Sequence, residues 1–436
     1  MSRLFSAARL TSFTAGLLLM ASLCLGSAVA APPFNDDIAH AQGLGSLDAD
    51  LAILDWTEAT RSPDDPLNPC EETLGITDKN VWYRYTTGAA TEYLNLWASG
   101  AEHDDAFAVY ESTTGGLQPL VGGCVRGRLH VQAYLVGARL LPNRTYFIEA
   151  RVEDPFAILH FAHSPVYHVT TEADTADGHC DSHCSLREAV TASNLTPGVI
   201  LFDQPGVYRL SRTGTDENDN ATGDLDIRRG VAIYGLGRDL ITLDGMASDR
   251  VIDARVIQRA ETFTIGDVAI LNGQPHDTQV SLIQNLGGGI LNFGWLDGGH
   301  LFMTIFNARF ALNSATGGGA ILLTEWALIV DTEFSFNSAS SSGGAILKAS
   351  VFQSVAAPRM DAARFPTITL TTAAHWPSTA CVSIPRRCTP TRRASAARWR
   401  KGGREARVFM PRPSLATPQP SMARASTRSR RMPPCS

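Results

Sequence analysis

Two short motifs recur along the chain at a spacing that few folds can accommodate. A glycine-rich motif ends in isoleucine three times, and the steps from Ile290 to Ile321 and from Ile321 to Ile346 are 31 and 25 residues. A second motif, Phe-x-x-Asn, begins at Phe310 and again 24 residues later at Phe334. A period of about 20 to 50 residues is typical of proteins built from stacked repeats.

We expect each repeat to be one coil of chain that returns to the same edge as the coil before it. Equivalent residues of successive coils would then lie about 4.8 Å apart, the spacing of neighbouring strands. Like side chains would stack, and the asparagines would form an amide ladder at a bend. Paired glycines allow the backbone to approach closely at another corner. The predicted repeat-stacking residues are Phe310, Asn313, Ile321, Phe334, Asn337 and Ile346.

The predicted fold class is all-β, with two different parts. Residues 165–348 are predicted to form a right-handed parallel β-helix, because unrelated glycine-rich loops would not repeat two motifs at similar spacing. Residues 31–164 contain short alternating runs separated by turn residues, which indicates an antiparallel β-sandwich. We expect Trp82, Tyr83 and Tyr110 to belong to its core. The clearest runs cover residues 81–85, 93–97, 106–110 and 145–149.

The N-terminus has the three parts of a secretory signal peptide, which we assign to residues 1–30. Arg3 and Arg9 supply positive charge before an apolar run at residues 15–25, which is too short to span a bilayer. A cleavage pattern of the Ala-x-Ala type ends at Ala30. We therefore expect an exported protein, extracellular or on the outer cell surface, with no transmembrane segment; a retained anchor is the alternative.

Export permits disulfides, and four cysteines lie in the body of the chain. Three pairings are possible, and we favour Cys70 with Cys124 and Cys180 with Cys184, because each pair then falls within one predicted domain. The histidines beside the second pair leave zinc binding as an alternative, although the spacing matches no common zinc motif.

Residues 184–190, with the sequence CSLREAV, resemble the CSLREAI signature of exported bacterial β-helix proteins. The paired Phe-x-x-Asn and Gly-Gly-Ala-Ile motifs resemble the repeats of polymorphic outer-membrane proteins. Both resemblances cover residues 167–347 and imply a surface-associated β-helix. Val190 stands where the signature ends in isoleucine, which is a conservative difference. Within the signature, Ser185 followed by Glu188 predicts a capping box, so we expect a short helix that covers the open end of the coils.

Residues 35–161 resemble the pre-peptidase C-terminal-type domain of secreted bacterial proteins. The resemblance rests on the VWYRY, FAVYESTTGG and TYFIEA segments. It implies an accessory module and no catalytic role for this part of the chain.

Charge limits what the body of the chain can bind. Residues 1–348 carry 21 Lys and Arg against 41 Asp and Glu, which argues against nucleic acid, since phosphate binding needs clustered positive charge. No catalytic residue is assigned, because we find no nucleophile elbow, phosphate loop or metalloprotease helix. Calcium is a possible cofactor, because carboxylate oxygens are its usual ligands. Its possible ligands are Asp216, Asp219, Asp224 and Asp226.

These observations predict a monomeric, non-catalytic protein of the adhesin type that presents a β-helical surface to a glycan or a cell surface. The alternative is a polysaccharide lyase or glycoside hydrolase with an acidic groove. The two functions predict different structures, because only the enzyme requires acidic side chains of successive coils to converge in one groove.

Residues 349–436 differ in composition from everything before them. They carry 16 Lys and Arg against 2 Asp and Glu, and the glycine-rich repeat stops. A segment of this kind cannot bury enough apolar surface to offset its ordering entropy, so we expect disorder. We interpret it as out-of-frame translation of an arginine-rich coding region; a genuine basic tail that binds anionic surfaces is the alternative.

Overall fold

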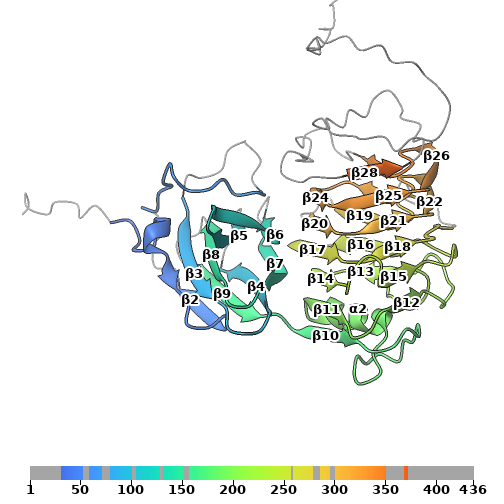
Figure 1. Cartoon of the computed structure of the whole chain (residues 1–436), viewed down its shortest axis with the longest axis horizontal. Helices are drawn as coiled ribbons and strands as arrows, with labels where there is room; N and C mark the ends of the chain where they lie inside the picture. Colours follow the sequence, from blue (N-terminus) through green and yellow to red (C-terminus); the bar gives the residue numbers. More distant parts are fainter. Residues whose placement is uncertain are drawn as a thin grey trace, which may run out of the picture. The chain divides into compact units, whose positions relative to one another are not determined.

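The computed structural model is nearly all β, with 49% strand and 5% helix. Among the residues that it describes, no helix has both the length and the apolar character needed to cross a bilayer. Those residues are 31–52, 58–70, 79–100, 105–127, 131–151, 157–256, 259–277, 285–294 and 300–349, with a further strand at 368–371 (Figure 1).

The N-terminal part consists of two mainly antiparallel sheets, which we call the N-terminal sheets. In one sheet a short parallel edge strand precedes four antiparallel strands. Its order is β1 (Gln42–Gly43), β3 (Val81–Thr86), β8 (Thr145–Arg151), β5 (Ala106–Thr113) and β6 (Gly116–Arg126). The other sheet has the order β7 (Ala133–Leu140), β4 (Glu92–Ser99), β9 (Ile158–His163) and β2 (Ala49–Ala52).

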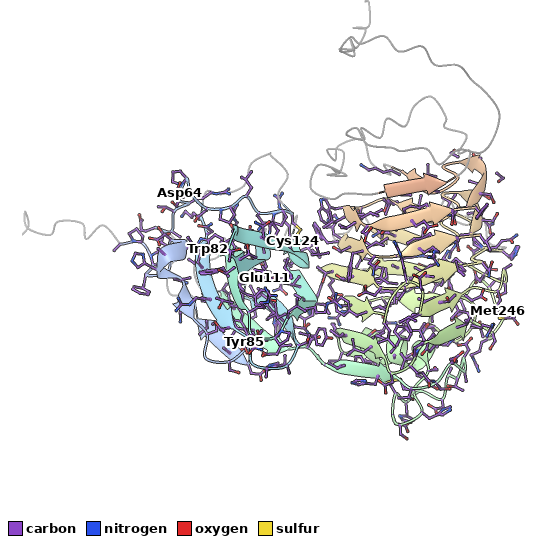
Figure 2. The ribbon with its side chains drawn as sticks, viewed as in Figure 1. Asp64, Trp82, Tyr85, Glu111, Cys124 and Met246 are labelled. Carbon is purple, nitrogen blue, oxygen red and sulfur yellow. A yellow bond between two sulfur atoms is a disulfide. The ribbon has the colours of Figure 1, made fainter. Side chains whose placement is uncertain are left out.

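One apolar core lies between these sheets. The expected core positions of Trp82, Tyr83 and Tyr110 are confirmed, because their side chains are 0%, 3% and 0% exposed. Figure 2 labels Trp82 among the strands of the N-terminal sheets. The same core buries Glu149, which accepts hydrogen bonds from the Tyr110 hydroxyl at 3.0 Å and from Nε of Arg151 at 3.0 Å. A buried charge is tolerated here because it is paired and hydrogen-bonded.

Residues 166–348 form what we call the parallel stack, in which the chain visits three parallel sheets in a fixed rotation (Figure 1). The first sheet contains β10 (Val166–Val169), β11 (Gly198–Phe202), β14 (Val231–Tyr234), β17 (Ala260–Gly266), β20 (His300–Phe306) and β24 (Ala327–Val330). The second contains β12 (Gly206–Arg209), β15 (Ile241–Asp244), β18 (Ala269–Leu271), β21 (Arg309–Ala311), β25 (Thr332–Ser335) and β28 (Ile368–Thr371). The third contains β13 (Leu225–Ile227), β16 (Ile252–Val256), β19 (Ile290–Gly294), β23 (Ile321–Leu323) and β27 (Ile346–Lys348). Strands β22 (Ser314–Gly317) and β26 (Ser338–Ser342) form a separate parallel pair.

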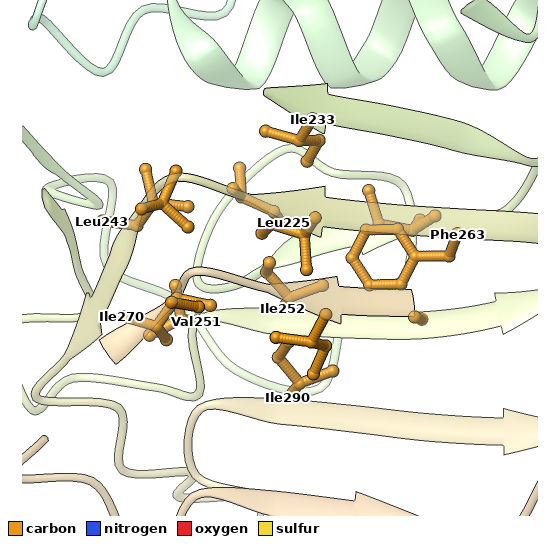
Figure 3. Close-up of a cluster of buried hydrophobic side chains, with 14 of the residues drawn as sticks. Leu225, Ile233, Leu243, Val251, Ile252, Phe263, Ile270 and Ile290 are labelled. Atoms are coloured by element: carbon orange, nitrogen blue, oxygen red, sulfur yellow. The ribbon is translucent and has the colours of Figure 1, made fainter. Parts of the chain in front are cut away.

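Alternate side chains of all three sheets point into the middle of the parallel stack, because successive residues of a strand face opposite ways. They are almost all aliphatic or phenylalanine and are fully buried, as Figure 3 shows for Leu225, Ile233, Leu243, Phe263 and Ile290. Fully burying one such side chain contributes about 1.5–3 kcal/mol. The curled shape is therefore held by an apolar column that runs from coil to coil.

The N-terminal sheets join the parallel stack through β7, which pairs with β17. The Tyr234 hydroxyl donates to the carbonyl of Gly137 at 2.8 Å. Gly137 has φ 65°, and a Cβ atom there would lie 2.7 Å from side-chain atoms of Ala232 and Val199. The outer face of the first parallel sheet is thus covered by the N-terminal sheets, at a distance that only glycine allows.

The expected disorder of residues 349–436 is wrong for one segment. Residues 368–371 form β28, which pairs in parallel with β25, so the second sheet continues past the end of the recognisable repeats. The sequence Ile-Thr-Leu-Thr has the β-branched composition that suits a strand. The rest of this segment after Ala349, and the predicted signal peptide at residues 1–30, lie outside the described residues.

Candidate functional site

The CSLREAV segment forms the start of helix α2 (Leu186–Leu195), and the predicted capping box is confirmed. The backbone N–H of Glu188 donates to the Ser185 hydroxyl at 3.1 Å, and the backbone N–H of Ser185 donates to the Glu188 carboxylate at 2.8 Å. Leu186, Ala189 and Val190 are buried in the core of the parallel stack. The helix therefore packs against the first coils, where unpaired strand edges would otherwise be exposed.

Both expected disulfides are present in the structure. One joins Cys180 to Cys184 directly before α2, and the other joins Cys70 to Cys124 in the N-terminal sheets. Cysteines bonded to each other do not supply the thiolates that the zinc alternative requires.

Arg187 is buried under α2 and holds the loop that leads into β13. Its Nε donates to the Asp174 carboxylate at 2.7 Å, and its guanidinium also donates to the carbonyls of Gly223 and Asp224 at 2.7 and 2.9 Å. A guanidinium with these partners is a structural crosslink, because its donors are already used.

Acidic side chains of the first coils do converge, around the buried Arg250. This guanidinium pairs with Asp224 at 3.0 Å, Asp253 at 3.2 Å and Asp277 at 2.9 Å. Asp226 lies beside Asp253 on the neighbouring strand. The cluster is closed to solvent, since Asp224 is 4% and Asp226 0% exposed.

Burial controls the protonation of this cluster. Loss of hydration raises the pKa of Asp226 to about 7, against an opposing effect of the Arg228 guanidinium. The same cause raises the pKa of Asp249 to about 6 and holds that of Asp224 well above its ordinary value. The neighbouring carboxylates act in the same direction, because like charges disfavour ionisation.

The four candidate calcium ligands are not brought together. Asp224 and Asp226 face Arg250 and Arg228, whereas Asp219 is exposed in the preceding loop and Asp216 lies in the same loop with φ 61°. Across the described ranges, no group of three or more Asp, Glu, His or Cys side chains is arranged to hold a metal ion.

The repeat residues stack between neighbouring coils. The rings of Phe310 and Phe334 lie 5.2 Å apart at an angle of 15°, and Ile346 pairs with Ile321 on the neighbouring strand. Nδ2 of Asn313 donates to Oδ1 of Asn337 at 3.0 Å, which is one rung of an amide ladder.

The outer faces of the three parallel sheets differ in how open they are. The first is covered by the N-terminal sheets, and the third carries Leu291 and Leu322, both fully buried. The second presents side chains that are mostly polar or charged. Those that are half-buried or exposed on it are Val207, Arg209, Thr242, Asp244, Leu271, Arg309 and Glu333.

The corner that follows the second sheet also exposes apolar side chains. Leu312 is 56% and Phe336 65% exposed, and both residues have a left-handed backbone with φ 60° and 55°. Met246 has the same conformation at the corner after β15 and is 49% exposed (Figure 2). Bulky residues rarely adopt this conformation. The open face of the second sheet and this rim together form the candidate binding face.

Comparison with known protein families and with curated proteins found no match. Among solved structures the chain is similar to one described as "Crystal structure of Agl-KA catalytic domain", with a TM-score of 0.23 and 9% identity. The match covers 61% of this chain and 57% of that one. A likeness this slight carries no argument about fold or activity.

Sequence reasoning did not find Arg250 or its partners Asp253 and Asp277. The only local signal is the spacing of Asp249, Arg250 and Asp253 ahead of and within one strand. Asp224 and Asp277 come from other coils and reach Arg250 only because each coil returns to the same side of the stack. That return depends on the number of residues in each coil.

Proposed function

We propose that the protein is exported and that its parallel stack acts as a non-catalytic binding module of the adhesin type. The parallel stack is interpreted as a right-handed parallel β-helix whose candidate binding face contacts a glycan or a cell surface. The fixed rotation of the chain through three sheets and the in-register stacking of repeats support this architecture. The resemblance of residues 184–190 to the CSLREAI signature adds to it.

The observation that carries the proposal is the open second sheet. It extends over several strands at constant spacing, and such a surface suits an elongated ligand. Arg209 lies beside Asp244, and Arg309 pairs with Glu333 at 3.4 Å and Asp239 at 2.6 Å. Charges that are balanced in this way, with the Thr242 hydroxyl among them, suit a neutral polar chain such as a glycan better than a polyanion.

The hydrolase or lyase alternative is less well supported. Its best candidates, Asp224 and Asp226, are buried and occupied by guanidinium groups, whereas a polysaccharide must reach both carboxyl groups.

A glycan array probed with the full-length chain tests the proposal. We expect binding that weakens at least about fivefold in Arg209→Ala and Arg309→Ala, roughly 1 kcal/mol. Arg84→Ala, an exposed arginine of β3, is the matched control and should bind normally. Release of reducing or unsaturated ends from polysaccharide, abolished by Asp226→Ala, would establish the enzyme alternative. No glycan binding, or equal binding by all variants, would refute the proposed face.

A further inference from the structure

Three adjacent antiparallel strands of the N-terminal sheets place a serine, a histidine and an aspartate side by side. In β4, Trp97 and Ser99 are two residues apart and so share one face. The register pairs Trp97 with His160 of β9, and His160 with Asp50 of β2. The sheet thus sets all four side chains in one cluster on the face opposite the apolar core.

Hydrogen bonds connect the three polar side chains in series. The Ser99 hydroxyl lies 2.6 Å from Nε2 of His160, and Nδ1 of His160 lies 2.7 Å from the Asp50 carboxylate. The histidine side chain is 19% exposed, and Ser99 is half-buried, so both can be reached from solvent. A nucleophile, a base bonded to it and a carboxylate that orients the base are the three elements of a serine hydrolase triad.

Trp97 fixes the imidazole plane. Its ring stacks on that of His160 with centroids 4.8 Å apart and an angle of 12°. The stacked indole therefore holds the imidazole in one orientation between Ser99 and Asp50.

We propose that Ser99, His160 and Asp50 form an acyl-transfer site that hydrolyses carboxylic esters. The Ser99 oxygen attacks the ester carbonyl carbon while Nε2 of His160 takes the hydroxyl proton. The bond between the carbonyl carbon and the leaving oxygen breaks, and His160 returns the proton to the departing alcohol. Water then cleaves the acyl-serine by the same route, which releases the acid and restores Ser99.

The residue after the nucleophile supports this assignment. Gly100 has φ 77°, so the chain turns away from the strand immediately after Ser99. The backbone N–H that follows a nucleophilic serine is a recurrent donor to the oxyanion, and we assign that role to Gly100.

The surroundings of the triad define the substrate class. The Asp50 side chain is 74% exposed, so the triad is open to solvent at its carboxylate end. We expect a site that is open on this side to accept short acyl groups carried on a large molecule. The site lies in the N-terminal sheets and does not depend on the binding face of the parallel stack.

A fluorophosphonate probe tests the site in the full-length chain. An activated serine displaces fluoride and becomes phosphonylated, and peptide mass spectrometry locates the adduct. We expect the adduct at Ser99, together with hydrolysis of p-nitrophenyl acetate. Both should be lost in Ser99→Ala and His160→Gln. Asp50→Asn should slow both about tenfold, less than for a buried aspartate because Asp50 is already solvated.

Two control variants separate the triad from general surface reactivity. His163→Ala removes a neighbouring histidine of β9 that pairs with Asp48 and Glu92, and Ser112→Ala removes an exposed serine of β5. Both should label like the unmodified protein. An unlabelled Ser99, or a Ser99 adduct that persists at the same rate in His160→Gln, would overturn the proposal. Asp50→Asn keeps the test decisive if Ser99→Ala fails to fold, since an exposed side chain is changed.

Discussion

Asn337 accepts two hydrogen bonds from Asn313, one from its backbone N–H at 3.1 Å and one from its side-chain Nδ2 at 3.0 Å. The Asn313 side chain also donates to the carbonyl of Ile270 and accepts from the backbone N–H of Gly273. One fully buried amide thus joins three successive coils.

Replacing this amide should destabilise the parallel stack. Asn313→Ala leaves the carbonyl of Ile270 and the N–H of Gly273 buried without their partner, and each such loss costs about 1–3 kcal/mol. We expect the free energy of unfolding in urea to fall by about 2–4 kcal/mol. Asn218→Ala, an exposed asparagine, is the control. A fall no larger than in this control would show that the ladder contributes nothing.

Removing the guanidinium from the acidic cluster should be more damaging. Arg250→Met keeps the aliphatic stem but leaves Asp224, Asp253 and Asp277 without their shared partner. Breaking a buried ion pair on one side costs about 3–5 kcal/mol. Thermal unfolding followed by circular dichroism measures the loss, and an unchanged melting temperature would contradict the prediction.

Asp226 should make the protein less stable as the pH rises. Its folded pKa of about 7 lies above the ordinary 3.8, so the folded state holds its proton more tightly. This contribution to stability is complete below about pH 4 and is lost as the pH rises through 7. Asp226→Asn should therefore flatten the pH dependence of urea unfolding between pH 4 and 8. If stability depended on pH in the same way in Asp226→Asn and in the unmodified protein, the predicted role of Asp226 would be disproved.

The contact at Gly137 should tolerate no side chain. Gly137→Val places a branched Cβ against Ala232 and Val199 and imposes φ 65° on a β-branched residue. We expect a loss of more than about 2 kcal/mol, combined from overpacking and backbone strain. Gly43→Val is the control, because nothing lies within 4 Å of a Cβ there. Equal melting temperatures for the two variants would mean that β7 does not pack as described.

The two disulfides should differ in the stability that they add. The bridge between Cys70 and Cys124 closes 54 residues and that between Cys180 and Cys184 only 4. Chain entropy then predicts that the free energy of unfolding falls by about 4 kcal/mol when the first pair is changed to serine. It should fall by about 2 kcal/mol when the second pair is changed. Denaturant unfolding of both double variants measures them, and the reverse order would refute the entropic explanation.

The repeats predicted contacts within the parallel stack better than contacts between distant segments. The stacking of Phe310 and Phe334 follows from spacing alone, because each coil repeats the one below it. The capping box at Ser185 is likewise a local pattern. The triad of Ser99, His160 and Asp50 has no such signal. It depends on the register of three strands that are far apart in the sequence, and a shift of one residue would turn His160 to the other face.

Coil length varies in the parallel stack, but the pitch does not. Ile290 pairs directly with Ile321, and Ile321 with Ile346, although these residues are 31 and 25 positions apart in the sequence. The strands stay in register despite this difference in length, so the alignment of the interior does not require coils of equal length. Insertions at a corner therefore change the outline of one edge without moving any strand out of alignment. A chain of this kind can acquire new surface loops coil by coil while its scaffold stays the same.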